Sequence, residues 1–244
     1  MEYQVHNVEW NDEKVKRFWD FHYNYEPFEP LWFTKAVGRE IIKLVRKFVS
    51  LKGEVLDYGV GKGHLTNYLL EDKNLQVYTC DFSDETAKNT NQQFFDRPNF
   101  RGCTLVAGFP SPYSENQFDV VFLIEAIEHL TDNYLFPTLK EIHRILKPGG
   151  TVVITTPNNE NLDLQNVVCP DCGCVFHRVQ HVRSFDSRRM TQLMQEKNFN
   201  SVFCEAVDLT DYGKSLPIRL AKNMIRMTKG KNYSAPHLVY IGNK

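Results

Sequence analysis

Hydrophobic positions along the chain switch repeatedly between two spacings. Short, nearly continuous apolar runs such as Phe118–Ile124 and Thr151–Thr156 are typical of strands that are buried on both faces. Longer segments with an apolar residue every three or four positions, such as Tyr134–Leu146, are typical of helices. Because the two kinds alternate, the pattern predicts an α/β fold with a doubly wound parallel sheet. Further strands are predicted at Val55–Asp57, Gln76–Cys80 and Cys103–Ala107, and further helices begin at His64, Ser83 and Ser187.

Two helices are predicted before the first strand, at residues 11–23 and at about 33–50. The first has an apolar face that includes Trp19, and the second is expected to direct Phe48 inward. The segment between them is aromatic and interrupted by two prolines. We therefore divide the chain into an N-terminal helical cap, 1–50, and a main domain, 51–244. The cap either only packs on the sheet or acts as a lid that excludes water. The residues that would close such a lid are Tyr25, Phe28, Trp32 and Phe33.

A glycine-rich turn after the first strand of the main domain is the first candidate binding site. The strand ends on Asp57, and three glycines follow, Gly59, Gly61 and Gly63. Glycine lets the backbone approach a ligand closely, and the helix that follows offers unpaired N–H groups. The dinucleotide-binding pattern G-x-G-x-x-G needs glycine at position 64, where this chain has His64, so a nicotinamide dehydrogenase is disfavoured. Asp81, at the tip of the second strand, can accept hydrogen bonds from both hydroxyls of a ribose.

Together, Asp57, the three glycines and Asp81 resemble the cofactor site of the class I, Rossmann-like S-adenosylmethionine-dependent methyltransferases. The segments FDVVFLIEAIEHL and LKPGGTVVITTPN match later motifs of that family, so the resemblance covers roughly residues 51–209. It implies a mostly parallel sheet of about seven strands that closes with Ser201–Val207 and an antiparallel His237–Ile241. It also implies S-adenosylmethionine as cofactor, bound by Asp57, Gly59, Gly61, Gly63, Asp81, Phe82, Gly108, Phe109 and Glu125.

The third strand shows a departure from the family. Related enzymes usually follow it with Gly-Asp, in which the acid bonds the adenine amino group, whereas this chain has Gly108–Phe109. The polar partner of the adenine is therefore left open. Phe82, directly after Asp81, is placed either to lie against the adenine or to pack in the core.

A polar cluster follows the fourth predicted strand. Glu125, Glu128 and His129 are spaced i, i+3, i+4, and on a helical turn all three point the same way. Carboxylates and an imidazole suit a divalent cation such as Mg²⁺, Mn²⁺ or Co²⁺. The E-x-x-E-H arrangement resembles that of the metal-dependent O-methyltransferases of ubiquinone biosynthesis and of small-RNA 2′-O-methylation. The resemblance to the RNA enzymes adds His181 as a further ligand.

Three interpretations of this cluster stay open. The first is a catalytic metal site formed by Glu125, Glu128, His129 and His181. In the second, His129 or His181 is a metal-free catalytic base and Glu128 bonds backbone N–H groups near it. In the third, the cluster is only structural.

Three of the six cysteines lie in a predicted Cys/His-rich insertion, 161–186. The C-P-x-C-G pattern at Cys169 and Cys172 is typical of a zinc knuckle. Cys174 and His177 would complete four ligands, or His177 and His181 would form the second pair. Otherwise the cysteines are reduced and pack in a loop. We expect the insertion to shape the acceptor pocket.

Charge and hydropathy limit the partners. The formal net charge of −1 offers no general attraction for nucleic acid, so an RNA substrate is disfavoured. No apolar run approaches the ~20 residues of a membrane span, and residues 1–6 lack a signal-peptide pattern, so we expect a cytoplasmic location. A basic helical insertion is predicted at 210–233, and its charge would attract an anionic acceptor. Its basic residues are Lys214, Arg219, Lys222, Arg226, Lys229 and Lys231.

The sequence therefore predicts an enzyme, an S-adenosylmethionine-dependent methyltransferase. We expect O-methylation of a small hydroxyl- or phosphate-bearing metabolite with help from a divalent metal. One alternative is a metal-independent methyltransferase with a histidine base. Another, from a different class, is a non-catalytic S-adenosylmethionine-binding module, which would leave the polar cluster unexplained. No motif indicates the oligomeric state.

Overall fold

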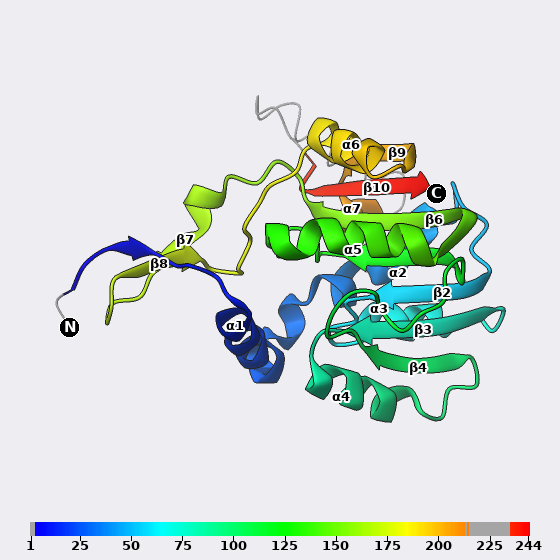
Figure 1. Ribbon diagram of the computed structural model, residues 1–244, viewed down its shortest axis with the longest axis horizontal. Helices are drawn as coiled ribbons and strands as arrows, with labels where there is room; N and C mark the ends of the chain where they lie inside the picture. Colours follow the sequence, from blue (N-terminus) through cyan, green and yellow to red (C-terminus); the bar gives the residue numbers. More distant parts are fainter. Residues whose placement is uncertain (1–2, 213, 215–234) are drawn as a thin grey trace.

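The computed structural model describes residues 3–212, 214 and 235–244, which form two separate β-sheets (Figure 1). The strands of the main sheet are β2 (Gly53–Tyr58), β3 (Leu75–Asp81), β4 (Phe100–Leu105), β5 (Phe118–Ile124), β6 (Leu146–Pro157), β9 (Asn200–Val207) and β10 (His237–Asn243). Their order is β4-β3-β2-β5-β6-β10-β9, and β10 pairs antiparallel with both of its neighbours. The predicted doubly wound, mostly parallel sheet is confirmed, including the closing pair of strands.

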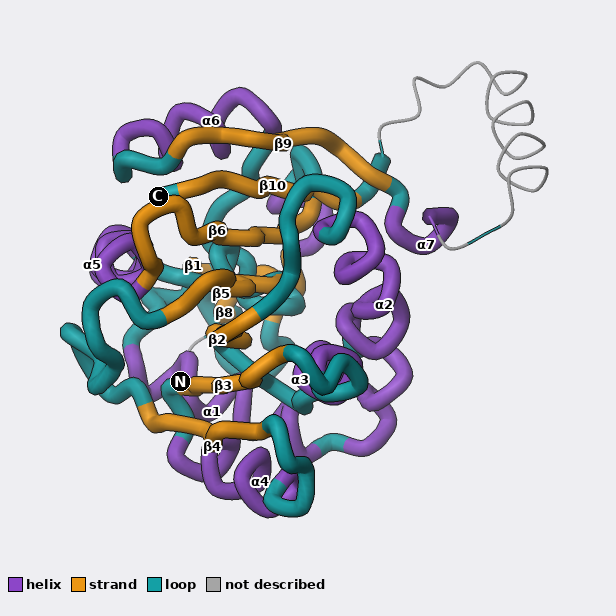
Figure 2. The backbone as a smooth tube through the Cα atoms, turned by 90° about the vertical axis from the view of Figure 1, so that its right-hand side faces the viewer, coloured by secondary structure: helices purple, strands orange, loops and turns teal. Residues whose placement is uncertain are grey.

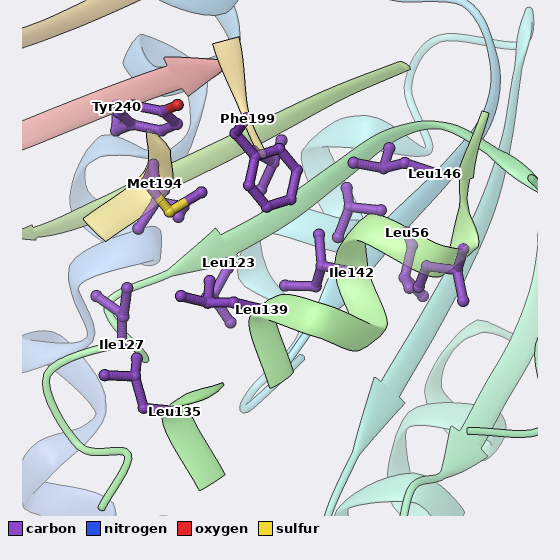
Figure 3. Close-up of a cluster of buried hydrophobic side chains, with 14 of the residues drawn as sticks. Leu56, Leu123, Ile127, Leu135, Leu139, Ile142, Leu146, Met194, Phe199 and Tyr240 are labelled. Carbon is purple, nitrogen blue, oxygen red and sulfur yellow. The ribbon is translucent and has the colours of Figure 1, made fainter. Parts of the chain in front are cut away.

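Helices cover both faces of the main sheet because its central strands are apolar on both faces. Along β5, Val120 and Phe122 join one buried cluster, and Val121 and Leu123 join the other. The first face is covered by α2 (Phe33–Val45) and α3 (His64–Leu69), and the second by α5 (Asp132–Ile145) and α6 (Ser187–Glu196) (Figure 2). Figure 3 shows the second cluster, in which side chains of α5 interdigitate with those of the strands.

Two local predictions at helix ends have different outcomes. Helix α4 (Asp84–Phe94) begins as predicted, because the Ser83 hydroxyl caps it by accepting the N–H of Thr86 at 3.3 Å. Helix α2 ends before the predicted residue 50, since the chain turns after Val45. Phe48 therefore lies beyond the helix and is 41% exposed, so its expected inward position is corrected.

The second sheet combines strands from two distant parts of the chain, the N-terminal cap and the Cys/His-rich insertion. It consists of β1 (His6–Asn7), β8 (Cys174–His177) and β7 (Asn166–Val168), in that order. It is preceded in the insertion by a short 3₁₀ turn, η2 (Leu162–Gln165). The predicted division at residue 50 separates β1 from β8, whereas the structure pairs them in parallel.

The rest of the cap comprises α1 (Asp12–Asn24) and a 3₁₀ turn, η1 (Glu26–Leu31). Figure 1 shows that α1 and the small sheet lie beyond the carboxyl ends of the parallel strands. Ligands of open parallel sheets bind at that edge. The cap and the insertion therefore face the region where the sequence predicts the cofactor.

The predicted basic insertion lies largely outside the described residues. Helix α7 (Leu209–Tyr212) covers its first residues, and Lys214 Nζ lies 2.6 Å from Asp211 Oδ1. Arg219, Lys222, Arg226, Lys229 and Lys231 are not described, so the role of this segment stays a prediction. Within the described ranges, every helix is too short or too polar to cross a membrane.

Candidate functional site

A cavity lies where the carboxyl ends of β2, β3 and β5 meet the N-terminal cap. On the side of the sheet it is lined by Asp57, Gly59, Gly61, Asp81, Phe82, Glu125 and His129. On the side of the cap it is lined by Trp19, Tyr23, Trp32 and Phe33. Aromatic residues of the cap thus cover the cavity, as the lid hypothesis requires, although Tyr25 and Phe28 are not among the lining residues.

The glycine-rich turn has a backbone shape that other residues would strain. The φ angles of Gly59, Gly61 and Gly63 are +82°, +52° and +72°. A Cβ at Gly63 would lie 2.8 Å from Cε2 of Phe94. The turn is held by Asp57, which accepts the Thr66 hydroxyl at 2.6 Å. Burial raises the pKa of Asp57 to about 7.

Asp81 is buried at the tip of β3 and organises the backbone around it. Its two carboxyl oxygens accept the N–H groups of Gly61 at 3.3 Å and Ser83 at 3.0 Å. Each oxygen keeps a lone pair for a further donor, such as a ribose hydroxyl. Burial raises the pKa of Asp81 to about 6. The neighbouring Phe82 is 54% exposed and lines the cavity, which fits contact with a ligand and not core packing.

The structure does not bring Gly108 and Phe109 to this cavity. Strand β4 ends at Leu105, and the chain then crosses toward α5, where Glu141 accepts the N–H of Ser111 at 3.0 Å. Phe109 consequently lies in a separate groove beside Phe136. The sequence-based placement of these two residues depended on a strand that continued to Ala107, and it is corrected here.

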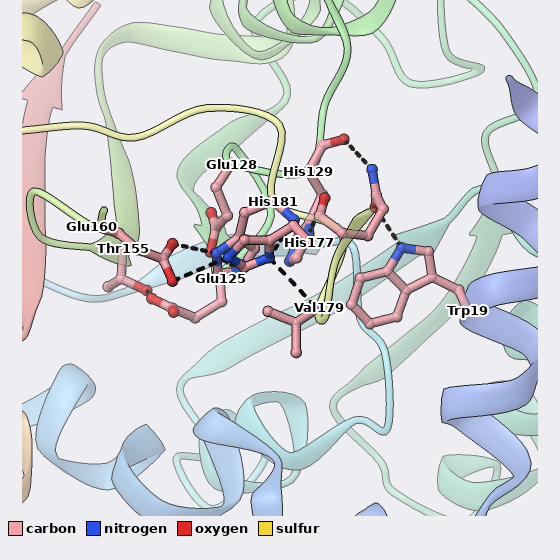
Figure 4. Close-up of polar contacts among 10 residues, drawn as sticks. Trp19, Glu125, Glu128, His129, Thr155, Glu160, His177, Val179 and His181 are labelled. Carbon is pink, nitrogen blue, oxygen red and sulfur yellow. Dashed lines mark hydrogen bonds and ion pairs between the residues drawn. The ribbon is translucent and has the colours of Figure 1, made fainter. Parts of the chain in front are cut away.

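Beyond β5, three of the four predicted metal ligands converge (Figure 4). Ligand atoms of Glu128, His129 and His181 lie within 4.8 Å of one another, and His181 Nε2 is 3.9 Å from Glu128 Oε1. Glu128 is 1% exposed, and neither carboxyl oxygen has a hydrogen-bond partner in the described part of the chain. Burial, followed by the charge of Glu125, raises the pKa of Glu128 well above its ordinary range. A buried carboxylate in this state requires either a cation or a proton.

The fourth predicted ligand, Glu125, lies apart from this group. Its φ of +48° places it in the left-handed region, and residues 125–129 form a turn in place of the helical turn that the spacing assumed. The Thr155 hydroxyl donates to Glu125 Oε1 at 2.8 Å, and burial raises the pKa of Glu125 to about 7. Glu125 instead lines the cavity described above, and its predicted contact with the cofactor stays a prediction.

Helix α1 fixes the loop that carries the histidines. The Trp19 indole N–H donates to Gln180 Oε1 at 2.8 Å, and Gln180 Nε2 donates to the backbone oxygen of His129 at 3.0 Å. The ring of Trp19 also meets the edge of His129 at 4.8 Å between centroids. Burial, together with the nearby His181, lowers the pKa of His129 to about 3, so that its imidazole is neutral near pH 7.

Glu160 is a site residue that the sequence reasoning missed. His181 Nδ1 donates to Glu160 Oε2 at 2.5 Å, which leaves the lone pair of Nε2 on the side of Glu128. His177 stacks on His181 at 4.6 Å, and its Nε2 is 3.5 Å from Glu160 Oε1. Glu160, His177 and His181 thus form a second group of metal-binding type. The sequence position of Glu160 could have indicated its role, because it lies three residues after the carboxyl end of β6, where ligands of parallel sheets bind.

The predicted zinc ligands separate in the structure. Side chains alternate along β8, so Cys174 lies on one face of the small sheet and His177 on the other. In the described ranges, each cluster of three or more donors within 4.8 Å lacks a cysteine. The pKa of Cys169 is nevertheless lowered from its ordinary value, because the backbone N–H groups of Cys172 and Asp171 favour its thiolate. His177 belongs instead with Glu160.

Comparison with known families identifies a methyltransferase domain in this chain. A family model described as a methyltransferase domain matches residues 33–202. A probable S-adenosylmethionine-dependent methyltransferase of Mycolicibacterium smegmatis is 32% identical over 146 residues, which are 60% of this chain and 51% of the relative. The chloroplastic tocopherol O-methyltransferase of Arabidopsis thaliana is 27% identical over 139 residues, 55% of this chain and 36% of the relative.

Solved structures share the fold. The 1,6-didemethyltoxoflavin-N1-methyltransferase of Burkholderia thailandensis, with its acceptor and S-adenosylhomocysteine bound, has a TM-score of 0.65 at 19% identity. The match covers 98% of this chain and 93% of that one. The chain spans 30% to 65% of the length of the first curated relatives it matches.

Proposed function

The chain belongs to the class I S-adenosylmethionine-dependent methyltransferases, and we propose that it methylates an oxygen of a small metabolite with the help of a divalent cation. The observation that supports the cation is the buried, unpartnered carboxylate of Glu128 beside the imidazoles of His129 and His181. An oxygen acceptor is supported because a metal ion lowers the pKa of a hydroxyl group that it binds and so makes it a better nucleophile.

The residues of the cavity fit S-adenosylmethionine. When bound, this cofactor supplies a methyl group on a positively charged sulfur, already activated for transfer. Asp81 offers free lone pairs to the ribose, and Phe82 offers an exposed apolar surface to the adenine. Gly61 leaves room for close approach of a ligand to the backbone, while Asp57 holds the turn through Thr66.

The donor set of Glu128, His129 and His181 fits a divalent cation. Two donors on one ion, each at about 2.1 Å, lie up to roughly 4.2 Å apart, and His181 Nε2 and Glu128 Oε1 are 3.9 Å apart. One carboxylate with two imidazoles suits Mn²⁺ or Co²⁺ better than Mg²⁺, which prefers oxygen ligands. A bound cation would act as a Lewis acid that lowers the pKa of the acceptor hydroxyl.

Other residues would orient these groups and exclude water. Glu160 holds His181 in the tautomer that exposes Nε2 toward Glu128. Trp19 and Trp32 close the cavity from the cap. Glu125 lines the same cavity, and its pKa of about 7 suits it to accept a proton near neutral pH.

A metal-independent methyltransferase is the second candidate, and the Glu160–His181 hydrogen bond favours it. A carboxylate that accepts from Nδ1 holds the imidazole in the tautomer that keeps a lone pair on Nε2, as a general base requires. His181 is better suited to this role than His129, whose pKa is lowered to about 3. The third candidate is an S-adenosylmethionine-binding module without catalysis. It gives no functional reason for the free-energy cost of burying the carboxyl group of Glu128 without a partner.

The acceptor is expected to be small and partly apolar, because aromatic residues of the cap line the cavity. Lys62 lines it as well, with Nζ 4.0 Å from the centroid of the Tyr23 ring. An anionic group on the acceptor would find a cation there. A phosphorylated or phenolic hydroxyl compound fits both features.

Chelation tests the proposal. Tag-free protein is treated with EDTA, and turnover is measured on a panel of hydroxyl acceptors while S-adenosylmethionine binding is followed by calorimetry, with NAD as negative control. EDTA should abolish turnover, and Mn²⁺ or Co²⁺ should restore it. Glu128→Gln should prevent restoration with little change in cofactor affinity, whereas the exposed Glu115→Gln should behave as wild type.

Each outcome distinguishes the candidates. Full turnover after exhaustive chelation would reject the metal and favour His181 as base. Turnover that survives Glu128→Gln would reject the assigned ligand set. Cofactor binding without turnover on any acceptor would favour the non-catalytic module.

A further inference from the structure

The small sheet of β1, β8 and β7 has little hydrophobic burial of its own. β1 and β7 are exposed along their whole length, and Val5, Val167 and Val168 are exposed as well. A sheet of this size with so little apolar contact is marginal in water, and small units of this kind are usually held by a disulfide or a metal. Its three cysteines, Cys169, Cys172 and Cys174, form no disulfide and are therefore available as metal ligands.

Backbone register places three donor side chains on one face of this sheet. The Cys169 N–H donates to the Cys174 oxygen at 2.8 Å, which extends the β7–β8 ladder by one pair beyond Val168 and Val175. On the other side, His6 pairs with Cys174 in the parallel ladder. Paired residues in a sheet direct their side chains to the same face, about 4.5–5.5 Å apart at Cβ. Cys169, Cys174 and His6 therefore share a face.

The turn between the strands brings a fourth donor to them. The Gly173 N–H donates to the Cys169 oxygen at 2.9 Å, so residues 169–173 form a tight turn that keeps Cys172 near Cys169. The glycine that follows, Gly173, has a φ of +77° and its carbonyl accepts the N–H of His6 at 3.1 Å. The turn is thereby fixed directly against β1.

We propose that Cys169, Cys172, Cys174 and His6 bind one zinc ion that joins the N-terminal strand to the insertion. Three thiolates and one imidazole are a common structural zinc set. His6 Nδ1 lies 2.9 Å from the Gln4 oxygen, so a proton there leaves Nε2 free as the ligand atom. His6 replaces His177, which lies on the opposite face and contacts Glu160.

Binding needs only side-chain rotation on a backbone already in register. In the described structure, no three of these four ligand atoms lie within 4.8 Å of one another. All four residues are solvent-accessible, so their χ1 angles can change without disturbing a core. The thiols would lose their protons on binding. This site is separate from the Glu128 cluster and does not depend on the proposed function.

Two histidine variants test the ligand set against each other. Tag-free protein is purified under reducing conditions, and zinc is measured by elemental analysis and by competition with a chromogenic chelator. Wild type should carry one zinc per chain. His6→Ala and Cys174→Ser should weaken zinc binding by at least the ~10- to 100-fold that even an outer-shell partner costs. His177→Ala is the matched control and should keep its zinc.

Cobalt substitution provides a second readout. Co²⁺ in wild type should give the intense absorption of a tetrahedral thiolate site, and His6→Ala should change its band positions while circular dichroism shows an unchanged fold. Absence of zinc and of this absorption in wild type would overturn the site. Loss of zinc in His177→Ala with retention in His6→Ala would overturn His6 as ligand. A Cys169–Cys172 disulfide, detected by thiol counting in protein purified without reductant and then zinc-loaded, would overturn the proposal as well.

Discussion

Asp81→Asn removes one negative charge at the tip of β3 and keeps the shape of the side chain. In the wild type, the two carboxyl oxygens hold the N–H groups of Gly61 and Ser83. The asparagine oxygen can still accept one of these N–H groups. The asparagine NH₂ group would face the other N–H group, and because both are donors that hydrogen bond is lost. The variant therefore loses the charge that the ribose hydroxyls would meet and part of the support of the glycine-rich turn.

The expected loss follows from the number of bonds affected. A hydrogen bond to a charged group contributes about 1.5–3 kcal/mol, so losing one such bond to the ribose should raise the Kd for S-adenosylmethionine roughly 10- to 150-fold. Isothermal titration calorimetry at neutral pH measures this directly. The matched control is Asp84→Asn, which removes an exposed charge three residues away that is paired with Lys88.

The same residue predicts a pH dependence. Burial raises the pKa of Asp81 from 3.8 to about 6, so the free protein resists its ionisation. Between pH 6 and pH 4 the folded state holds more protons at this group than the unfolded state, so its contribution to stability improves as the pH falls. Cofactor binding has the opposite sign, because ribose hydroxyls bond the ionised form. Below about pH 6, affinity should fall more steeply in wild type than in Asp81→Asn.

The comparison between the two proteins is needed because other groups titrate in the same cavity. Burial raises the pKa values of Asp57 and Glu125 to about 7 each, and both are present in wild type and variant. Only the difference between the two pH profiles reports on Asp81. Affinity within twofold of wild type in Asp81→Asn would refute the ribose assignment. An equal loss in Asp84→Asn would show that long-range charge, and not direct contact, explains the effect.

Two further predictions concern stability. Trp19→Phe should leave Gln180 Oε1 unpaired and lower the free energy of unfolding in urea by about 1–3 kcal/mol; an unchanged value would mean that α1 does not hold the histidine loop. Gly63→Ala should lower the thermal midpoint more than Gly149→Ala, because both have positive φ but an added Cβ meets Phe94 only at Gly63. Equal decreases of the thermal midpoint in the two variants would mean that backbone strain alone, and not the contact with Phe94, destabilises Gly63→Ala.

The main sheet was predictable because its information is local. β5 has the same bounds in the prediction and in the structure, since a strand apolar on both faces needs no distant partner to be recognised. β1 had no such signal, because it comprises two exposed residues whose partners are more than 160 positions away in the sequence. Pairing at that range depends on where the whole cap is placed.

The site residues show the same difference between local and distant information. The rule that ligands bind at the carboxyl ends of parallel strands singles out Asp57, Asp81 and Glu125, and the structure places all three at one cavity. Their contact with the cofactor stays a prediction. Spacing failed at Glu125, because its left-handed backbone breaks the helical turn on which the i, i+3, i+4 argument rests. Gln180 had no signal, since its role consists of contacts with Trp19 and His129 from two other parts of the chain.

These contacts make the cap part of the site and not only its cover. β1 attaches the N-terminus to β8, and α1 attaches Trp19 to the loop that follows the same strand. His177 ends β8, and the loop that follows carries Gln180 and His181, so the cap contacts the insertion at both β8 and this loop. The cavity is lined by that same cap. A ligand that displaces α1 to enter must therefore break the Trp19–Gln180 bond, and its restoration on closure would return His129 and His181 to the positions beside Glu128. The small sheet thus fixes one end of the cap, and Trp19 holds the cap at the loop that carries Gln180.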